Sequence, residues 1–404
     1  MNVLMVWELG AGLGHTIPLA AIGACLTGNG HHVSYALRKP KTAAAAGIEP
    51  GVDVCAAPTM GPLRPNQNAA YDCADMLLLR GYEMPDRLDG RLDSWLRIFE
   101  QFSPGTIVTD HAPGARLAAE IAGIPTHAIG NGFAIPPLTS PLQPFIQPPN
   151  SHVTRQQDAE RRLNDAINAA LCRYGRPEIE RAVDLFFGGS TFLITLEELD
   201  NYNNRQGAVY YGPPFRESAG VSPQWPPRRP PQWSTGASKR VFVYLYPDAP
   251  VLPMVLTGLD QLGVSTVVYA GPNGASDFAH LTTRNVVFTE QPFALTKPPT
   301  RCDLVICQGG GNTVATSLLQ GIPVLIYPRH VEQQMACRHL KSQGLAEILD
   351  NTSDQDTVSQ TILQCLNNES LHKCAAAFAR KYQSFDGKHV AKSIADQISP
   401  RMSS

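Results

Sequence analysis

The stretch from residue 302 to residue 344 constrains the fold more than any other part of this chain. It opens with a short apolar run, Leu304–Cys307, of the kind that forms a strand buried on both faces of a parallel sheet. Glycines at 309–311 follow, and then a helical pattern that stops at Gly321. A second apolar run, Pro323–Tyr327, comes directly afterwards. Strand, glycine loop, helix and strand in this order predict a parallel α/β sheet.

The turn after the first of these strands predicts a binding site for an anion. Asn312 and Thr313 open the helix, and the first N–H groups of a helix have no partner within it. Glycine leaves room for another group to approach the backbone closely. Phosphate is the anion that such a helix start typically binds. The polar pair Glu332-Gln333 follows the second strand, at the start of the next helix.

The same alternation of strands and helices occurs in both halves of the chain. In the first half we predict strands at Val3–Trp7, Val33–Leu37 and Thr106–Thr109, with helices at Ile17–Leu26 and Ala115–Ala122. In the second half we predict further strands at Arg240–Tyr246, Ser265–Ala270 and Asn285–Thr289. This rhythm indicates an α/β protein with two doubly wound parallel sheets.

A chain of 404 residues is long enough for two domains. The proline-dense segment 212–239 marks the boundary between them, although a surface loop within one domain is the alternative. We therefore predict an N-terminal domain over 1–211 and a C-terminal domain over 240–380. The remaining segment, 381–404, completes a final helix at about Leu371–Ile398 that no strand follows.

The rhythm breaks in two regions of the first half, 58–100 and 131–190. We interpret both regions as insertions into the α/β domain. The second region carries helical patterns at Val153–Cys172 and Glu178–Phe187.

Composition excludes several classes of protein. Hydrophobic residues are 43% and charged residues 17%, as in an ordinary globular protein, and the net charge of −2 favours neither a nucleic acid nor an anionic membrane as partner. No apolar run approaches about 18 residues, so we expect no integral membrane segment. The start of the chain lacks the basic region of a signal peptide. The nine cysteines show no metal-ligand spacing, so we expect no metal and a cytoplasmic setting.

The glycines, prolines and polar residues of the second half also match a family signature. The chain resembles the inverting nucleotide-sugar glycosyltransferases of family 1, which have the GT-B fold of two Rossmann-like domains facing a central cleft. The matching positions are Gly310, Thr313, Gly321, Pro323, Pro328, Gln333 and Ala336. The resemblance covers most of the chain. It implies an enzyme that moves a sugar from a UDP- or dTDP-sugar to a small-molecule acceptor, as a monomer or homodimer, without a metal or other cofactor. It also implies that the last helix crosses back to the first domain.

A glycine-rich loop precedes the first helix and ends in Gly14-His15. Its spacing differs from that of a dinucleotide fingerprint, and Arg38 and Lys39 stand where such a site has an acid, so an NAD enzyme is not favoured. Gly14-His15-x-x-Pro18 instead resembles the motif whose histidine is the family's catalytic base. Such a histidine can take the proton of an attacking hydroxyl, and the positive end of the helix favours its neutral form. The alternative is a histidine that caps the helix or is simply exposed.

A base that becomes cationic needs an anion to orient it. Asp110 lies at the carboxyl end of the strand Thr106–Thr109 and resembles the family's aspartate in this role. The alternative is an N-cap for the helix Ala115–Ala122. Neighbouring residues of a strand point to opposite faces, so we expect His111 to point elsewhere and keep it as a secondary candidate.

The resemblance further implies donor-binding residues, with departures from the family pattern. Gln308 stands where the family has a histidine that bonds the diphosphate, and its amide donates without a charge. Thr316 replaces the glutamate that holds the ribose hydroxyls, which favours a dTDP donor, and Tyr246 replaces part of a small Gly-Ser pair. The implied contacts to the sugar are Glu332 and Gln333, and the nucleotide base is expected near Gln291. The implied contacts to the diphosphate are Gln308, Gly310, Gly311, Asn312 and Thr313.

Acceptor contacts are expected at Gly14, Tyr82 and Phe133, and the apolar character of the insertions suggests a hydrophobic small molecule. The Asp354-x-Asp356 pair resembles a metal-binding motif, but its place before a helix predicts a cap. Two other functions stay open. The changed donor positions motivate a non-catalytic sugar-nucleotide-binding homologue, and a GT-B epimerase is the third possibility.

Overall fold

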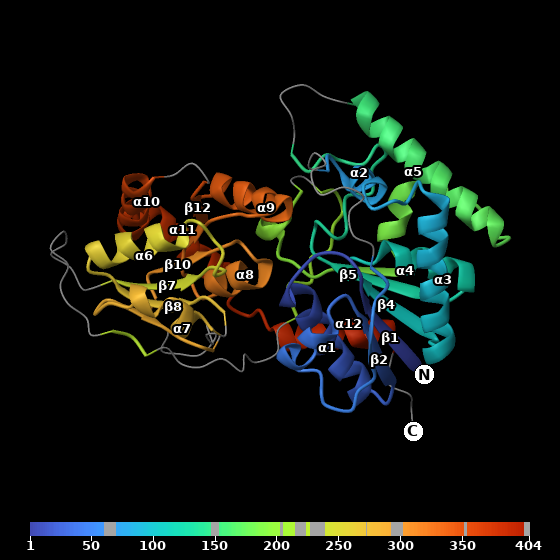
Figure 1. Cartoon of the computed structure of the whole chain (residues 1–404), viewed down its shortest axis with the longest axis horizontal. Coiled ribbons are helices and arrows are strands. Elements are labelled where there is room, and N and C mark those ends of the chain that lie inside the picture. Colours follow the sequence, from blue (N-terminus) through green and yellow to red (C-terminus); the bar gives the residue numbers. More distant parts are fainter. Residues whose placement is uncertain are drawn as a thin grey trace. The chain divides into compact units, whose positions relative to one another are not determined.

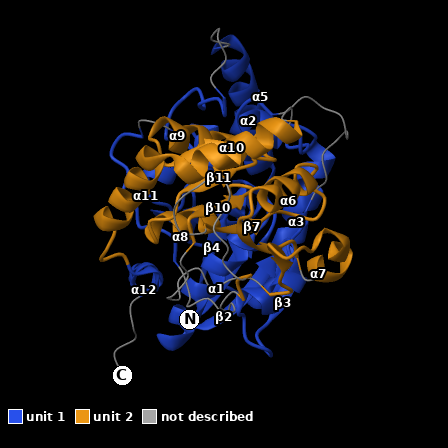
Figure 2. Ribbon diagram, turned by 90° about the vertical axis from the view of Figure 1, so that its left-hand side faces the viewer, with its two compact units in different colours: residues 1–216, 386–404 blue, residues 217–385 orange. Residues whose placement is uncertain are grey.

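The computed structural model describes residues 1–59, 70–146, 153–202, 205–214, 224–226, 239–271, 273–291, 302–350 and 354–399. They form two compact units, which Figure 1 shows with element labels and Figure 2 shows in two colours. Unit 1 comprises residues 1–216 and 386–404, and unit 2 comprises residues 217–385. Most of the segment predicted as a linker, 212–239, lies outside the described residues.

Unit 1 is built on a six-stranded parallel sheet with the order β3-β2-β1-β4-β5-β6. The strands are β1 (Asn2–Trp7), β2 (His32–Leu37), β3 (Val54–Ala56), β4 (Thr106–Asp110), β5 (Thr126–Gly130) and β6 (Ser190–Leu193). The α-helices are α1 (Leu13–Gly28), α2 (Cys73–Leu78), α3 (Pro85–Phe102), α4 (Pro113–Ala122), α5 (Val153–Arg173) and α12 (Gly387–Ile398). The central strands β1 and β4 are buried along almost their whole length, as expected for strands in the middle of a covered parallel sheet.

Unit 2 contains a second six-stranded parallel sheet, with the order β12-β11-β10-β7-β8-β9. The strands are β7 (Arg240–Tyr244), β8 (Ser265–Tyr269), β9 (Val286–Phe288), β10 (Leu304–Cys307), β11 (Val324–Ile326) and β12 (Ala346–Ile348). The α-helices are α6 (Leu252–Gln261), α7 (Gly274–Asp277), α8 (Gly311–Leu319), α9 (Val331–Ser342), α10 (Gln355–Asn367) and α11 (Glu369–Lys381). One apolar core joins the sheet to α6 and α10.

The two sheets have the same topology. In each, the first strand is central, the next two strands extend to one side and the last three extend to the other. The predicted doubly wound sheets are therefore confirmed. The direction of winding changes between β1 and β4 in unit 1 and between β7 and β10 in unit 2. Ligands of such sheets bind outside the carboxyl ends of the strands at this point.

The C-terminal helix α12 belongs to unit 1, although unit 2 precedes it in the chain. It packs beside α1, as Figure 1 shows. Its buried residues Val390, Ala391 and Ile394 repeat at helical spacing, so one apolar face holds the helix in place. The Asn29 amide also donates to the Asp396 carboxylate at 3.0 Å.

The single final helix predicted over about Leu371–Ile398 is wrong, because the structure has two helices there, α11 and α12. The side chain of Asp386 accepts the backbone N–H of Lys388 at 2.9 Å and so starts the second helix. The helix predicted over Glu178–Phe187 is also wrong. A single 3₁₀ turn, Ala182–Phe186, forms in its place.

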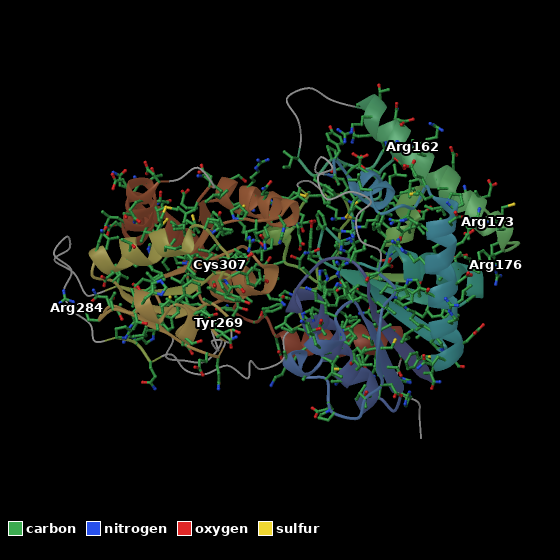
Figure 3. All side chains as sticks on the ribbon, viewed as in Figure 1. Arg162, Arg173, Arg176, Tyr269, Arg284 and Cys307 are labelled. Atoms are coloured by element: carbon green, nitrogen blue, oxygen red, sulfur yellow. The ribbon has the colours of Figure 1, made fainter. Side chains whose placement is uncertain are left out.

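The predicted helix near Val153–Cys172 is confirmed as α5, which ends at Arg173. Its arginines Arg162 and Arg173 are labelled in Figure 3. They form ion pairs with Glu83 and Asp89, which lie just before and within α3. Each such exposed pair contributes about 0–1 kcal/mol, so the buried apolar face of α5 supplies most of its attachment.

Candidate active site

His15 and Asp110 lie together at the carboxyl end of the unit 1 sheet. His15 is in the first turn of α1, and Asp110 ends β4. The His15 Nδ1 atom lies 3.0 Å from an Asp110 carboxylate oxygen, and the two side chains are 12% and 3% exposed. The structure therefore brings these two predicted residues into direct contact at the point where the winding of the sheet changes.

Two residues of the β1–α1 segment define the place of the His15 ring. The indole of Trp7 stacks on it, with ring centroids 5.2 Å apart and an angle of 16° between the planes. Gly10 has φ of +93°, and a Cβ atom there would lie 2.2 Å from the His15 Nε2 atom. Gly14, by contrast, is exposed, and a Cβ there would meet no atom within 4 Å.

The capping alternative for Asp110 is wrong. The N-cap of α4 is Ala112, which has no side-chain bond to the helix. The carboxylate of Glu8 caps α4 instead, because its Oε2 atom accepts the N–H groups of Gly114 at 2.8 Å and Ala115 at 3.2 Å. Sequence reasoning missed Glu8, and its one signal was an acid directly after a buried central strand. Burial raises the pKa of Glu8, while the Arg91 charge and the two N–H groups oppose that shift.

His111 does not point elsewhere, so that prediction is wrong. Its backbone φ of +46° turns the chain directly after β4. Its ring centroid then lies 6.1 Å from that of His15 and 5.7 Å from that of Phe133, which it meets edge-on. Burial, then the neighbouring charges of His15, Arg80 and Arg38, hold the pKa of His111 well below its usual range. His111 is thus a neutral imidazole beside the candidate base.

The predicted acceptor residues differ in their surroundings. Phe133 is 7% exposed, and its ring packs against Phe145 with centroids 4.8 Å apart. Tyr82 is 0% exposed, and the Arg91 guanidinium covers its ring at 4.5 Å from the centroid. Tyr82 therefore lies in the interior of unit 1 in this conformation, where a ligand does not reach it.

The predicted diphosphate loop lies at the carboxyl end of β10 in unit 2. Gly309 has φ of +84°, and Gly310 is the N-cap of α8. Gly311, Asn312 and Thr313 form the first turn, so the helix begins one residue earlier than expected. A Cβ on Gly310 or Gly311 would meet no atom within 4 Å, which leaves the backbone N–H groups approachable.

Two side chains near this loop have different partners. Gln308 is 5% exposed, and its amide oxygen has no hydrogen-bond partner among the described residues. The Thr316 hydroxyl instead donates to the Asn312 carbonyl at 2.7 Å, within α8. A ligand could therefore donate a hydrogen bond to the buried Gln308 amide oxygen, whereas the Thr316 hydroxyl already donates within α8.

The second polar pair lies at the start of α9. The Gln333 side-chain oxygen accepts the N–H groups of Arg329 at 2.8 Å and His330 at 3.3 Å, so this residue caps the helix. Glu332 lies in the first helical turn. Gln291 lies after β9, and its backbone bonds the Thr289 hydroxyl.

Sequence reasoning missed a link between two loops at this end of unit 2. The guanidinium of Arg329, before α9, bonds both carboxylate oxygens of Asp248 at 2.6 and 2.9 Å. Tyr246 lies under the same guanidinium, 6.0 Å from it. The segment after β7 that departs from the Gly-Ser pattern is therefore tied to the loop after β11.

Asp354 caps α10 by accepting the N–H of Thr357 at 2.8 Å, as predicted. Over the described parts of the chain, no group of three or more histidines, cysteines or acids is arranged to hold a metal ion. Within the same residues, no helix is long and apolar enough to cross a membrane.

No protein-family model matches the chain. The zeaxanthin glucosyltransferase of Pseudescherichia vulneris is 25% identical over 311 residues, which are 72% of this chain and 73% of that protein. The PGL/p-HBAD biosynthesis rhamnosyltransferase of Mycobacterium bovis is 23% identical over 302 residues, which are 70% of this chain and 65% of that protein. The solved structure of the spinosyn rhamnosyltransferase SpnG, complexed with thymidine diphosphate, has a TM-score of 0.68 and 20% identity, over 98% of this chain and 100% of that chain.

These similarities agree with the architecture of the chain. The likeness to SpnG extends over both units and shows the GT-B fold. The curated homologues, which match more than two thirds of this chain, are glycosyltransferases. On these grounds the chain is a glycosyltransferase with the GT-B fold.

Proposed function

We propose that the protein is an inverting glycosyltransferase that moves a sugar from a dTDP- or UDP-sugar to a hydroxyl group of a small-molecule acceptor. The contact between His15 and Asp110 at 3.0 Å carries this proposal. When the Nδ1–H group donates to Asp110, the lone pair of the neutral ring is on Nε2. That nitrogen is then the atom that takes the proton of the acceptor hydroxyl.

The reaction proceeds as a single displacement. The acceptor oxygen bonds to the anomeric carbon of the sugar while its proton passes to His15. The bond from that carbon to the diphosphate oxygen breaks, and the diphosphate keeps the electron pair. Because the leaving group departs from the face opposite the attack, the configuration at this carbon inverts. The Asp110 carboxylate compensates the imidazolium that forms.

The start of α8 supports a role in binding the donor. The N–H groups of its first turn, at Gly311, Asn312 and Thr313, can bond the diphosphate and stabilise the charge that grows on it. The Gln308 amide and the Glu332 carboxylate are the proposed side-chain contacts. Solved complexes of SpnG with thymidine diphosphate and of VinC with dTDP favour dTDP as the nucleotide. The nucleotide-sugar is a co-substrate, and the proposal requires neither a metal nor another cofactor.

The aromatic surroundings of His111 support an acceptor with an apolar body. The Phe133 ring meets His111 edge-on and packs against Phe145, with 33° between the two phenyl planes. SpnG has also been solved with the spinosyn aglycone. An acceptor bound by this chain would place its hydroxyl at His15 and its apolar part against Phe133.

The test of the base is the variant His15→Ala. We expect the turnover number to fall by about 10²–10⁴-fold, with dTDP binding unchanged. His32→Ala is the matched control, because the His32 side chain is 65% exposed in the same unit. Asp110→Asn is expected to reduce turnover without changing the melting temperature greatly. Full transfer by His15→Ala would refute the role of base.

Two further measurements decide between this function and its alternatives. The anomeric configuration of the product, read by NMR, tests inversion. Thermal unfolding with dTDP, UDP, GDP and ADP tests the donor site, since a ligand at about 100 times its dissociation constant adds about 2.7 kcal/mol of stability. No shift with any nucleotide would favour a homologue that has lost catalysis.

A further inference from the structure

Three arginines lie around Glu8 at the carboxyl end of the unit 1 sheet. Arg38 directly follows β2 and Glu8 directly follows β1, and the Arg38 Nη1 atom donates to the Glu8 carbonyl at 3.2 Å. Arg91 approaches from α3, with its Nη1 atom 3.5 Å from the Glu8 Oε1 atom. Its Nη2 atom donates to the carbonyl of Arg80 at 3.5 Å, which places Arg80 beside the same cluster.

The two oxygens of the Glu8 carboxylate have different partners within unit 1. The Oε2 atom caps α4 through Gly114 and Ala115. The Oε1 atom accepts no hydrogen bond among the described residues and lies 3.5 Å from the Arg91 Nη1 atom. The side chains of Glu8 and Arg91 are both 0% exposed. Glu8 therefore compensates mainly the buried Arg91, and its charge also acts on Arg80 at longer range.

Arg38 and Arg80 are half-buried cations that form no direct ion pair in the described parts of the chain. Across the described residues, no carboxylate oxygen lies within 4.0 Å of either guanidinium. Burial and the charges of Arg38 and Arg91 lower the pKa of Arg80, and the Glu8 charge opposes this shift. A pair of crowded positive charges of this kind is unfavourable unless an anion binds to it.

The arginines and the candidate base, His15, lie at the same end of the unit 1 sheet. The strands before Arg38, Glu8 and Asp110 are adjacent in the sheet, as β2, β1 and β4. Both arginines are also among the charges that act on His111, whose ring is next to His15. A ligand at His15 would therefore lie near the His111 ring, on which both arginines act and which Phe133 contacts.

From this arrangement we infer that the acceptor carries an anionic group, a carboxylate or a phosphate, which Arg38 and Arg80 bind beside His15. The inference rests on the proposed function and names the class of acceptor. Guanidinium groups form strong, geometrically matched hydrogen bonds with both kinds of anion. The acceptor is thus amphipathic, with an apolar or aromatic body that carries a hydroxyl and an acidic group.

Three small probes test this inference on the full chain: benzoate, phenyl phosphate and benzyl alcohol. Calorimetry or thermal unfolding at constant ionic strength is expected to detect binding of the two anions and no comparable binding of the neutral alcohol. Arg38→Gln and Arg80→Gln should each weaken anion binding about tenfold. Arg97→Gln, which removes an exposed guanidinium from α3, should leave it unchanged. The anion that binds more tightly, benzoate or phenyl phosphate, identifies the acidic group of the acceptor as a carboxylate or a phosphate.

The outcome that overturns the inference is binding of benzyl alcohol as tight as that of the anions, or an equal loss in Arg97→Gln. Arg80→Lys keeps the charge and should keep most of the affinity, so it separates lost charge from lost folding. Thermal shifts with dTDP are measured on the same samples. Loss of the dTDP response with intact benzoate binding would refute the donor site and leave the anion site standing.

Discussion

A side chain on Gly10 cannot coexist with the observed position of His15. A Cβ atom built on Gly10 lies 2.2 Å from the His15 Nε2 atom, far inside van der Waals contact. The loop also needs φ of +93° at this residue, which side-chain-bearing residues rarely adopt. Residue 10 must therefore be glycine for the His15 ring to occupy its observed position.

The variant Gly10→Ala should lose activity because the methyl group displaces the imidazole from Asp110. We expect a decrease in turnover of about 10²-fold or more, approaching that of His15→Ala, with dTDP binding retained. Gly28→Ala, at the end of the same helix, meets no atom within 4 Å and is the control. Steady-state kinetics make the comparison, and wild-type turnover in Gly10→Ala would show that the ring position is not critical.

Asp72 should make the stability of unit 1 fall as the pH rises. It caps α2 through the N–H of Asp75, and burial raises its pKa from 3.8 to about 6. The folded state therefore holds a proton that the unfolded chain releases, so the contribution is present below about pH 4 and is lost as the pH rises through 6. Ionisation of Asp72 should therefore make the free energy of unfolding at pH 7 about 3 kcal/mol lower than below pH 4, from 2.2 pKa units at about 1.36 kcal/mol each.

Asp72→Asn keeps the capping oxygen and removes this charge. Urea unfolding should show it more stable than the wild type at pH 7 and equal to it near pH 4. Asp354→Asn is the matched control, because the N–H of Thr357 lowers the pKa of that exposed cap, and its contribution is lost as the pH falls. Equal effects of pH on the two variants would contradict the assignment.

His111 should affect the rate without setting its pH dependence. The variant His111→Asn retains a residue that tolerates the positive φ and removes the ring that contacts His15 and Phe133. We expect kcat/KM to fall about two- to tenfold, the size of a lost aromatic pair. The acidic limb of the pH–rate profile should not move, because His111 is already neutral there. A shifted limb would mean that His111 itself titrates in catalysis.

Gln308 should bind the donor at the expense of stability. Its buried amide oxygen lacks a partner among the described residues, and such a group costs about 1–3 kcal/mol. The variant Gln308→Met has a similar volume and no such cost, so its thermal midpoint without ligand should equal or exceed that of the wild type. Its affinity for dTDP should fall about three- to tenfold, measured by calorimetry. Unchanged dTDP affinity would remove Gln308 from the donor site.

Much of the fold follows from local sequence. Short apolar strands such as Val3–Trp7 and Leu304–Cys307 are bounded by glycine and by helix signals, and both lie where the pattern predicts them. The break between α11 and α12 was not predicted, because the pair Asp386-Gly387 occurs within an apparently continuous helical pattern. A cap is a contact between a side chain and a backbone group, which periodicity does not report.

Two doubly wound sheets, a histidine at the start of α1 and an acid at the end of β4 are all predictable from the sequence. The contacts between side chains of distant elements are not, because they depend on how the elements pack. A positive φ turned His111 towards His15, the interior of unit 1 enclosed Tyr82, and Glu8 took the capping role that was the alternative for Asp110. Strand and helix patterns are set by neighbours in the chain, whereas burial and charge compensation depend on residues far apart in it, such as Glu8 and Gly114. The proposed anion site at Arg38 and Arg80 also joins residues from separate elements.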